Sequence, residues 1–267
     1  MSAWFFGKKD FRVAQEEESS DFVSLSSHAL RSPLSIIKWY TEILLDGDAG
    51  PLTEDQRKYL SLIESSNQRA IDLVRSLLNV SRLELDTFSV SPEESDLKDV
   101  IASVIETLKE SADKKHVTLE QDTQEGAPHV VLDKHLVSMI LKILLGNAIT
   151  FSREGGGVRT ALTQLKEGEE IGGNSVATDS IIISVADSGI GIPEADKSKI
   201  FSKMFRAGNV KDTEGSDSGL GLYIVKAVLD RVGGQVWFSS QENVGTTFYV
   251  ALPLEGMKKK EGRTTLD

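Results

Sequence analysis

The sequence predicts a protein of two domains: an all-α antiparallel helical hairpin that forms a dimeric four-helix bundle, followed by an α+β sandwich. The chain has 267 residues, which suits two domains of ordinary size. Apolar residues near the N-terminus recur at alternating steps of three and four, and the remainder mixes apolar helices with short strands. With 39% hydrophobic and 27% charged residues, the composition is that of a globular protein with a packed core.

The hairpin is predicted from two heptad stripes with a break between them. The first helix spans residues 22–45, and Gly50 and Pro51 interrupt the pattern after it. Thr53 is the expected N-cap of the second helix, which ends near Leu85. The first stripe holds Phe22, Leu25, Ala29, Ser32, Ile36, Trp39 and Ile43, and the second holds Leu60, Ile63, Asn67, Ala70, Val74, Leu77 and Ser81.

An isolated hairpin of this kind leaves apolar stripes uncovered. A second copy of the chain is the simplest cover for both helices, so we expect a homodimer built on a four-helix bundle. The alternative is that the hairpin packs against the rest of its own chain.

The second domain is predicted from a change of pattern after a linker at residues 91–96. Helices are expected over residues 97–114 and 134–149, and strands over 117–121, 158–165, 180–186, 235–239 and 246–252. Residues 166–175 are expected to form a hairpin exposed to water. The predicted divisions are an N-terminal segment 1–20, the hairpin domain 21–90, the sandwich 96–255 and a tail 256–267.

Charge and composition exclude several classes of function. The net charge of -11 and the pI near 5.0 argue against nucleic-acid binding, which needs clustered Lys and Arg; the tail residues 258–260 are expected to be solvated. The absence of cysteine excludes disulfides and thiolate chemistry. No apolar run approaches the roughly 18 residues that cross a bilayer. Trp4, Phe5 and Phe6 form either an interfacial anchor or an ordinary frayed terminus.

The stretch "VADSGIGIP", residues 185–193, predicts a ligand-binding turn at the end of a strand. Gly189 and Gly191 let the backbone approach a ligand, and the Asp187 carboxylate offers an acceptor for an exocyclic amine such as that of adenine. The alternative is an ordinary turn, which a D-x-G-x-G sequence also forms.

A second glycine cluster, "SDSGLGLYIVKAVLDRVGG" at residues 216–234, opens a helix. Backbone N–H groups at Gly219 and Gly221, beside the positive end of a helix, suit nucleotide phosphates. Residues 194–215, between the two clusters, are expected to form a mobile lid. Arg206 in that lid either reaches a terminal phosphate or is solvated.

A third signal is the apolar helix "LVSMILKILLGNAITFS", residues 136–152, which carries Asn147 near its end. Asn147 is either a satisfied polar core residue or an amide ligand of a Mg²⁺ that also holds phosphate oxygens. The glycine clusters downstream favour the second interpretation.

Together these motifs resemble those of sensor histidine kinases, over residues 21–253. "SHALRSPL" resembles the phosphoacceptor box, "GNAITFS" the asparagine box, "DSGIGIP" and "SGLGLYIVK" the glycine boxes, "IFSKMFRAG" the phenylalanine box and "GGQVWFSSQENVGTTFYVALP" the closing strands. The resemblance implies a dimerisation and histidine-phosphotransfer domain followed by an ATP-binding domain of the Bergerat type, shared with Hsp90, gyrase and MutL. It also implies ATP and Mg²⁺ as cofactors, and adds Leu220 and Thr247 to the nucleotide-binding residues.

In this resemblance His28 is the phosphoacceptor. The imidazole flanks the heptad stripe and faces solvent, and Pro33 is expected to bend the helix just below it. The implied reaction is autophosphorylation of His28, with Asn147 holding Mg²⁺ and Arg206 steadying the γ-phosphate. The phosphoryl group then passes to an aspartate of a response-regulator receiver domain. Ser32 stands where the family has a residue implicated in phosphatase activity.

Three departures from the family pattern leave an alternative open. Ala29 replaces the usual acidic or polar residue after the phosphoacceptor, Ile143 replaces a first Asn, and Thr150 replaces a basic residue. These favour a nucleotide-binding scaffold that docks a partner without phosphotransfer, whereas His28 and Asn147 favour the enzyme. A chaperone or repair ATPase is disfavoured because such proteins need no histidine on a dimeric hairpin. We expect a cytoplasmic protein, with membrane association only through an upstream region of a longer sensor.

Overall fold

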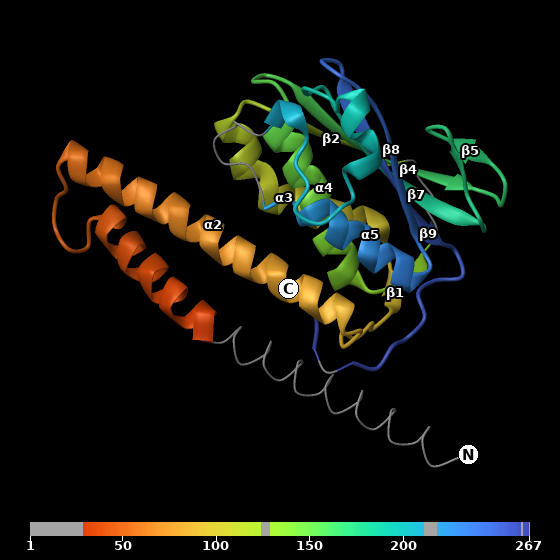
Figure 1. Ribbon diagram of the computed structural model, residues 1–267, viewed down its shortest axis with the longest axis horizontal. Helices are drawn as coiled ribbons and strands as arrows, with labels where there is room; N and C mark the ends of the chain where they lie inside the picture. The colour runs from red at the N-terminus through yellow and green to blue at the C-terminus, as the bar shows by residue number, and fades with distance from the viewer. Residues whose placement is uncertain (1–28, 124–128, 211–217, 263, 267) are drawn as a thin grey trace, which may run out of the picture. The chain divides into compact units, whose positions relative to one another are not determined.

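The computed structural model describes residues 29–123, 129–210, 218–262 and 264–266. The chain divides into two compact units between Thr87 and Phe88 (Figure 1). The first unit is helical, and the second combines helices with a mixed β-sheet. The predicted fold class, a helical hairpin followed by an α+β sandwich, is confirmed.

The first unit is a hairpin of two helices. Residues 29–46 are helical, a turn follows, and α2 spans Glu54–Glu84. The predicted cap of α2 is confirmed as a capping box, because the Thr53 hydroxyl accepts from the Gln56 N–H and the Gln56 side chain accepts from the Thr53 N–H. The helical assignment continues through Pro33. The predicted stripe residues Phe22 and Leu25 lie outside the described residues.

The second unit is built on a five-stranded sheet. Its strand order is β2 (Thr118–Thr123), β4 (Gly157–Leu165), β7 (Ser180–Asp187), β9 (Gly245–Pro253) and β8 (Gln235–Gln241). The β2–β4 pair is parallel and the other three pairs are antiparallel. Each of these strands was predicted within two residues of its observed ends, because alternating apolar residues mark the strands well.

Three helices cover one face of this sheet: α3 (Leu97–Lys114), α4 (Lys134–Phe151) and α5 (Gly221–Val232) (Figure 1). Asp96 and Asp133 cap the N-termini of α3 and α4, and Gly233 ends α5 in the left-handed conformation. By length and hydropathy α4 alone of the described helices would be long and apolar enough to cross a membrane. Half of that span is buried inside the fold, as befits a core helix.

Two short strands lie in segments that were predicted to be irregular. β1 (Glu93–Ser95) falls in the predicted linker and pairs in antiparallel fashion with β3 (Val130–Leu132). Single strands of three residues carry too little alternation to be detected, and only pairing between distant segments stabilises them. The linker prediction for residues 91–96 is therefore wrong in part.

The opposite face of the sheet is partly covered by the predicted hairpin, β5 (Glu170–Ile171) and β6 (Asn174–Ser175). The Trp237 indole stacks on the Tyr249 ring, with centroids 5.6 Å apart, and its Nε1–H donates to the Ile171 carbonyl at 3.0 Å. Ile171 packs against this buried cluster, so the hairpin is a cover for the sheet as well as an exposed loop.

The predicted tail packs into the second unit. Residues 256–262 and 264–266, here called the C-terminal strap, pair with residues 88–90: Val90 and Lys260 exchange backbone hydrogen bonds, and the Ser89 N–H donates to the Thr264 carbonyl at 2.9 Å. Lys260 Nζ donates to the Phe88 carbonyl at 2.7 Å and lies 4.3 Å from the centroid of its ring. Leu266 and Phe88 are fully buried. Of the three tail lysines, Lys260 is thus packed rather than solvated.

Candidate active site

A pocket of about 850 Å³, counting its open mouth, lies between the sheet and the helices of the second unit. It is lined by residues from α4, from the end of β7, from the segment 190–210 and from the start of α5. Six predicted site residues line it: Asn147, Asp187, Gly191, Arg206, Gly219 and Gly221. The structure therefore brings the asparagine, glycine and phenylalanine boxes together at one cavity.

Asp187 is fixed at the end of β7 by two backbone donors. Its Oδ1 accepts from the Gly189 N–H at 2.9 Å and from the Thr246 N–H at 3.2 Å. Burial raises the pKa of this carboxyl, and the two backbone hydrogen bonds oppose that shift. Both bonds use Oδ1, so Oδ2 is available to accept from an exocyclic amine, as predicted.

The glycines of the first box are required by the protein's own packing. A Cβ on Gly189 would lie 2.3 Å from the Phe151 carbonyl oxygen, and one on Gly191 would lie 2.1 Å from the Gln241 carbonyl oxygen. Gly191 also has φ of +66°, a left-handed conformation that favours glycine. We predicted these glycines from their approach to a ligand. The structure adds a second reason, since Gly189 does not line the pocket whereas Gly191 does.

The second glycine box delivers the N-terminus of α5 to the pocket. Gly219 has φ of +71° and packs against the Phe205 carbonyl, and α5 begins at Gly221 without a side-chain cap. Its first N–H groups are therefore available to an anion at the cavity edge. Leu220, which the resemblance placed among the nucleotide-binding residues, is only 2% exposed and does not line the pocket.

Asn147 projects from the last turns of α4 into the pocket lining. Within the described part of the chain no residue forms a hydrogen bond with its side-chain amide, and Asn147 is half-buried at the pocket wall. No cluster of three or more His, Asp or Glu occurs in the described residues. The amide oxygen therefore fits a Mg²⁺ that takes most of its ligands from phosphates and water.

Arg206 lines the pocket from the segment that follows β7. One of its guanidinium nitrogens, Nη2, donates to the Val210 carbonyl at 2.7 Å. The segment contains two 3₁₀ helices, Glu194–Lys199 and Gly208–Val210. Residues 211–217 of the predicted lid lie outside the described residues.

Thr246, and not the predicted Thr247, lines the pocket. Thr246 lines the cavity and donates its N–H to Asp187, while Thr247 does not contribute to the lining. Successive residues of a strand point to opposite faces, so Thr246 shares the inner face with Phe248. The sequence held a signal for this choice, because a large apolar residue such as Phe248 is expected on the buried face, and Thr246 lies on the same face of the strand.

The structure describes the surroundings of Ile143 and Thr150, two of the three departures from the family pattern. Ile143 packs close to Gly221, since a Cβ there would lie 3.0 Å from Ile143 Cγ2. Lys115 Nζ donates to the Ile149 carbonyl at 3.2 Å and to the Thr150 carbonyl at 2.5 Å. Burial lowers the pKa of this ammonium group. This ammonium satisfies the C-terminal end of α4, which has no basic residue in its last turn.

On the hairpin, the structure describes Ser32 but not His28. Ser32 lies on the helix over residues 29–46 and is exposed, as is Ala29 at its first described turn. The predicted phosphoacceptor His28 lies immediately before this helix and outside the described residues. The predicted exposure of His28 is therefore untested, whereas Ser32 is exposed in the single chain.

Comparison with known families accounts for both units. The model described as "Histidine kinase-, DNA gyrase B-, and HSP90-like ATPase" matches residues 132–256, and the "His Kinase A (phospho-acceptor) domain" matches residues 18–86. This chain belongs to the histidine kinases. The expected resemblance is confirmed, with both characteristic domains in the predicted order.

Individual proteins similar to this histidine kinase support the assignment. The autoinducer 2 sensor kinase/phosphatase LuxQ of Vibrio cholerae is 30% identical over 252 residues, which are 92% of this chain and 28% of LuxQ. Full-length ShkA in complex with AMPPNP superimposes with a TM-score of 0.69 at 23% identity, covering 90% of this chain and 47% of ShkA. ThkA in complex with the response regulator TrrA superimposes with a TM-score of 0.59 at 22% identity, covering 95% of this chain and 67% of the ThkA chain. The two structures show a shared fold, and the chain spans less than half of LuxQ and of ShkA.

Proposed function

We propose that this chain is an ATP-dependent protein-histidine kinase that autophosphorylates His28 and passes the phosphoryl group to an aspartate of a response regulator. The observation that carries the proposal is the convergence of Asn147, Asp187, Arg206 and Gly219 on one pocket. The same chain also carries a phosphoacceptor domain. A nucleotide scaffold needs the pocket alone, whereas a kinase needs both.

The nucleotide is held from its two ends. Asp187 accepts from the adenine amine, and the uncapped N-terminus of α5 receives the phosphates. A Mg²⁺ held by the Asn147 amide oxygen would neutralise charge on those phosphates. Arg206, a permanent cation at the pocket wall, stabilises the charge on the terminal phosphate. Thr246, in place of Thr247, supports Asp187 from the neighbouring strand.

In the transfer step an imidazole nitrogen of His28 attacks the γ-phosphorus of ATP. A nitrogen–phosphorus bond forms as the bond to the β,γ-bridging oxygen breaks, ADP leaves with that oxygen, and the imidazole loses its N–H proton to solvent. Positioning and charge neutralisation supply most of the acceleration in such reactions. General-base catalysis is typically worth about 10²- to 10⁴-fold in rate, and Ala29 offers no such base beside His28, so we expect transfer to be slower than with an acidic neighbour but not lost.

The partners are a second copy of the chain and a receiver domain. Ile36, Trp39 and Ile63 of the predicted stripes are 52%, 59% and 47% exposed in a single chain, which supports a dimer through the hairpin. ThkA, of the same fold, forms a complex with a response regulator. The exposed hydroxyl of Ser32 and the kinase/phosphatase LuxQ support phosphatase activity toward the regulator as well. ATP and receiver domains place this reaction in the cytoplasm.

The deciding experiment is incubation with γ-labelled ATP and Mg²⁺, beside His28→Ala, with ATP binding measured on both proteins. We expect acid-labile, base-stable label on the parent only, and equal ATP affinity for the two. ATP binding without label on either protein would contradict the kinase and favour the scaffold suggested by Ala29, Ile143 and Thr150. Hydrolysis of ATP without a phosphorylated histidine would instead indicate an ATPase.

A further inference from the structure

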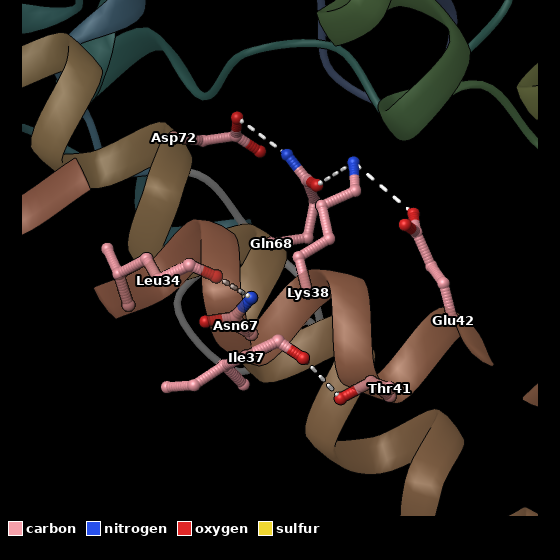
Figure 2. Close-up of polar contacts among 8 residues, drawn as sticks. All are labelled: Leu34, Ile37, Lys38, Thr41, Glu42, Asn67, Gln68 and Asp72. Atoms are coloured by element: carbon pink, nitrogen blue, oxygen red, sulfur yellow. Dashed lines mark hydrogen bonds and ion pairs between the residues drawn. The ribbon is translucent and has the colours of Figure 1, made fainter. Parts of the chain in front are cut away.

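The two helices of the hairpin are joined by a buried amide. Asn67 on α2 is only 7% exposed, and its Nδ2 donates to the backbone carbonyl of Leu34 on the facing helix at 2.9 Å (Figure 2). Two further bonds join the helices at partly or fully exposed positions: Lys38 Nζ donates to the Gln68 side-chain oxygen at 3.2 Å, and Arg57 donates to the Leu45 carbonyl at 3.1 Å beside the turn. Asn67 thus supplies a buried, directional contact between the two helices.

The position of this contact along the helix matters. Leu34 directly follows Pro33, which has no N–H to donate to the Ala29 carbonyl and whose ring crowds that turn. The helix is therefore weakest just ahead of Leu34, in the turn that carries Ser32 and leads back to His28. A carbonyl oxygen has two lone pairs, so Leu34 accepts from Asn67 without giving up its own helical bond.

Polar side chains near Asn67 form contacts of their own, but they do not supply a buried hydrogen bond between the helices. Gln68, the neighbour of Asn67, donates to Asp72 at 3.0 Å, and Lys38 forms an ion pair with Glu42 at 3.8 Å (Figure 2). These groups are partly exposed and flexible, so they contribute little to a fixed geometry. Thr41 is also buried, at 5% exposed, but its hydroxyl donates to Ile37 of its own helix at 2.7 Å.

We propose that Asn67 is a positioning residue, which fixes the register of the helix over residues 29–46 against α2 and thereby holds the turn with Ser32, four residues after His28 in the sequence. A single buried polar side chain in a helical seam commonly specifies register at a cost in stability. Apolar side chains slide past one another with little change in buried area, whereas a hydrogen bond to one carbonyl does not. The inference rests on the proposed kinase only where His28 phosphorylation is concerned.

The test compares Asn67→Leu with Thr41→Val. Both changes remove a buried polar group and keep the number and branching of the side-chain heavy atoms, but only the first removes a bond between the helices. The chain has no cysteine, so Ser35→Cys and Ser65→Cys give a single pair of spin labels, one on each helix. Labelled protein diluted into an excess of unlabelled chain reports the distance distribution within one hairpin.

We expect Asn67→Leu to keep or raise the melting temperature, to broaden or shift the distance distribution, and to lower kcat for His28 phosphorylation at least tenfold with KM for ATP unchanged. Thr41→Val should leave the distances and kcat unchanged. Asn67→Ser, which removes the amide without adding apolar bulk, should broaden the distances in the same way, and it replaces Asn67→Leu if that variant does not fold.

An unchanged distance distribution in a folded Asn67 variant would overturn the proposal, whatever the effect on melting temperature. So would a broadened distribution with unchanged kcat, because Asn67 would then set register without consequence for transfer. If the parent protein binds ATP but forms no phosphohistidine, the kinase fails. The distance measurement still decides whether Asn67 sets the register.

Discussion

The hairpin and the ATP-binding unit differ in what they do with their apolar side chains. In the ATP-binding unit Leu97, Ile101 and Leu132 are fully buried, and the β5–β6 hairpin and the C-terminal strap cover further apolar surface. In the hairpin, Ile36 and Trp39 remain more than half exposed. One unit buries a large apolar core within a single chain, while the other leaves large apolar side chains exposed, as is typical of a surface that binds a partner.

The two units also use polar groups differently. In the ATP-binding unit the polar groups Asp187 and Asn147 are gathered in the lining of one cavity. In the hairpin the buried amide of Asn67 faces a backbone carbonyl of the protein itself. The first arrangement suits ligand binding, and the second suits a fixed register between the two helices. Variants that disturb one unit should therefore leave the principal property of the other intact.

The largest effect is expected from Phe88→Ala, which tests whether the ATP-binding unit depends on its strap. Phe88 is fully buried and packs beneath Lys260 and Gly262. Truncation of a buried phenylalanine costs about 3–5 kcal/mol of unfolding free energy. Urea denaturation of the ATP-binding unit measures it, with the exposed Val244→Ala as control. A loss below about 1 kcal/mol would mean that the strap is dispensable.

Ile63→Glu should disrupt the dimer without affecting ATP binding. The charge would enter the seam between two copies, at a cost of about 3 kcal/mol or an increase of about 100-fold in the dimer dissociation constant. Sedimentation velocity over a concentration series detects the change, and Ser61→Glu on the same helix is the control. Equal dissociation constants for the two variants would exclude the predicted stripe as the dimer contact.

Asp187→Asn should weaken ATP binding by about 10- to 100-fold, because a hydrogen bond to a charged acceptor in a partly buried site is lost. Isothermal titration calorimetry measures the affinity, and Asp122→Asn on the outer strand of the same sheet is the matched control. The dimer dissociation constant should not change. Unaltered ATP affinity would show that adenine is recognised elsewhere.

Thr246→Val should weaken ATP binding by about two- to tenfold, whereas Thr247→Val should not change it. The difference follows from the side chains, because that of Thr246 lines the pocket and that of Thr247 does not, whereas the Thr246 N–H that donates to Asp187 is kept in both variants. Parallel titrations of the two variants suffice. The reverse order of effects would restore the residue that the motif alone had suggested.

The smallest effect is the pH dependence of stability in the ligand-free protein. Burial raises the pKa of Asp187, so the folded state favours the protonated form more than the unfolded chain does. Its contribution is therefore fully present below the ordinary pKa of aspartate, about 3.9, and is lost as the pH rises through the folded pKa. Asp187→Asn should melt higher than the parent at neutral pH, with no gain at the acidic end.

Local chemistry made much of this fold predictable. Thr53 and Gln56 form a capping box, which involves only residues within one turn, and the sequence accordingly locates the start of α2. The glycine boxes were equally visible. The β1–β3 pair and the C-terminal strap were not, because each depends on hydrogen bonds between residues distant in sequence, such as Ser89 and Thr264.

The site was predicted in composition and missed in detail. Asn147, Asp187 and Gly219 line the pocket as expected. Leu220 and Thr247 were carried over from motif strings, which record neighbourhood but not the direction of a side chain. The pleat of β9 decides between Thr246 and Thr247, and it becomes apparent only when the strand is aligned on its buried Phe248.

The C-terminal strap also brings the first and last segments of the ATP-binding unit together. The Ser89 N–H and the Thr264 carbonyl are 2.9 Å apart, so the unit closes on itself near the point where the hairpin joins it. A domain whose ends meet can be circularly permuted or inserted into another protein with little added loop entropy. A short linker between residues 88 and 266 should therefore suffice to circularise the ATP-binding unit.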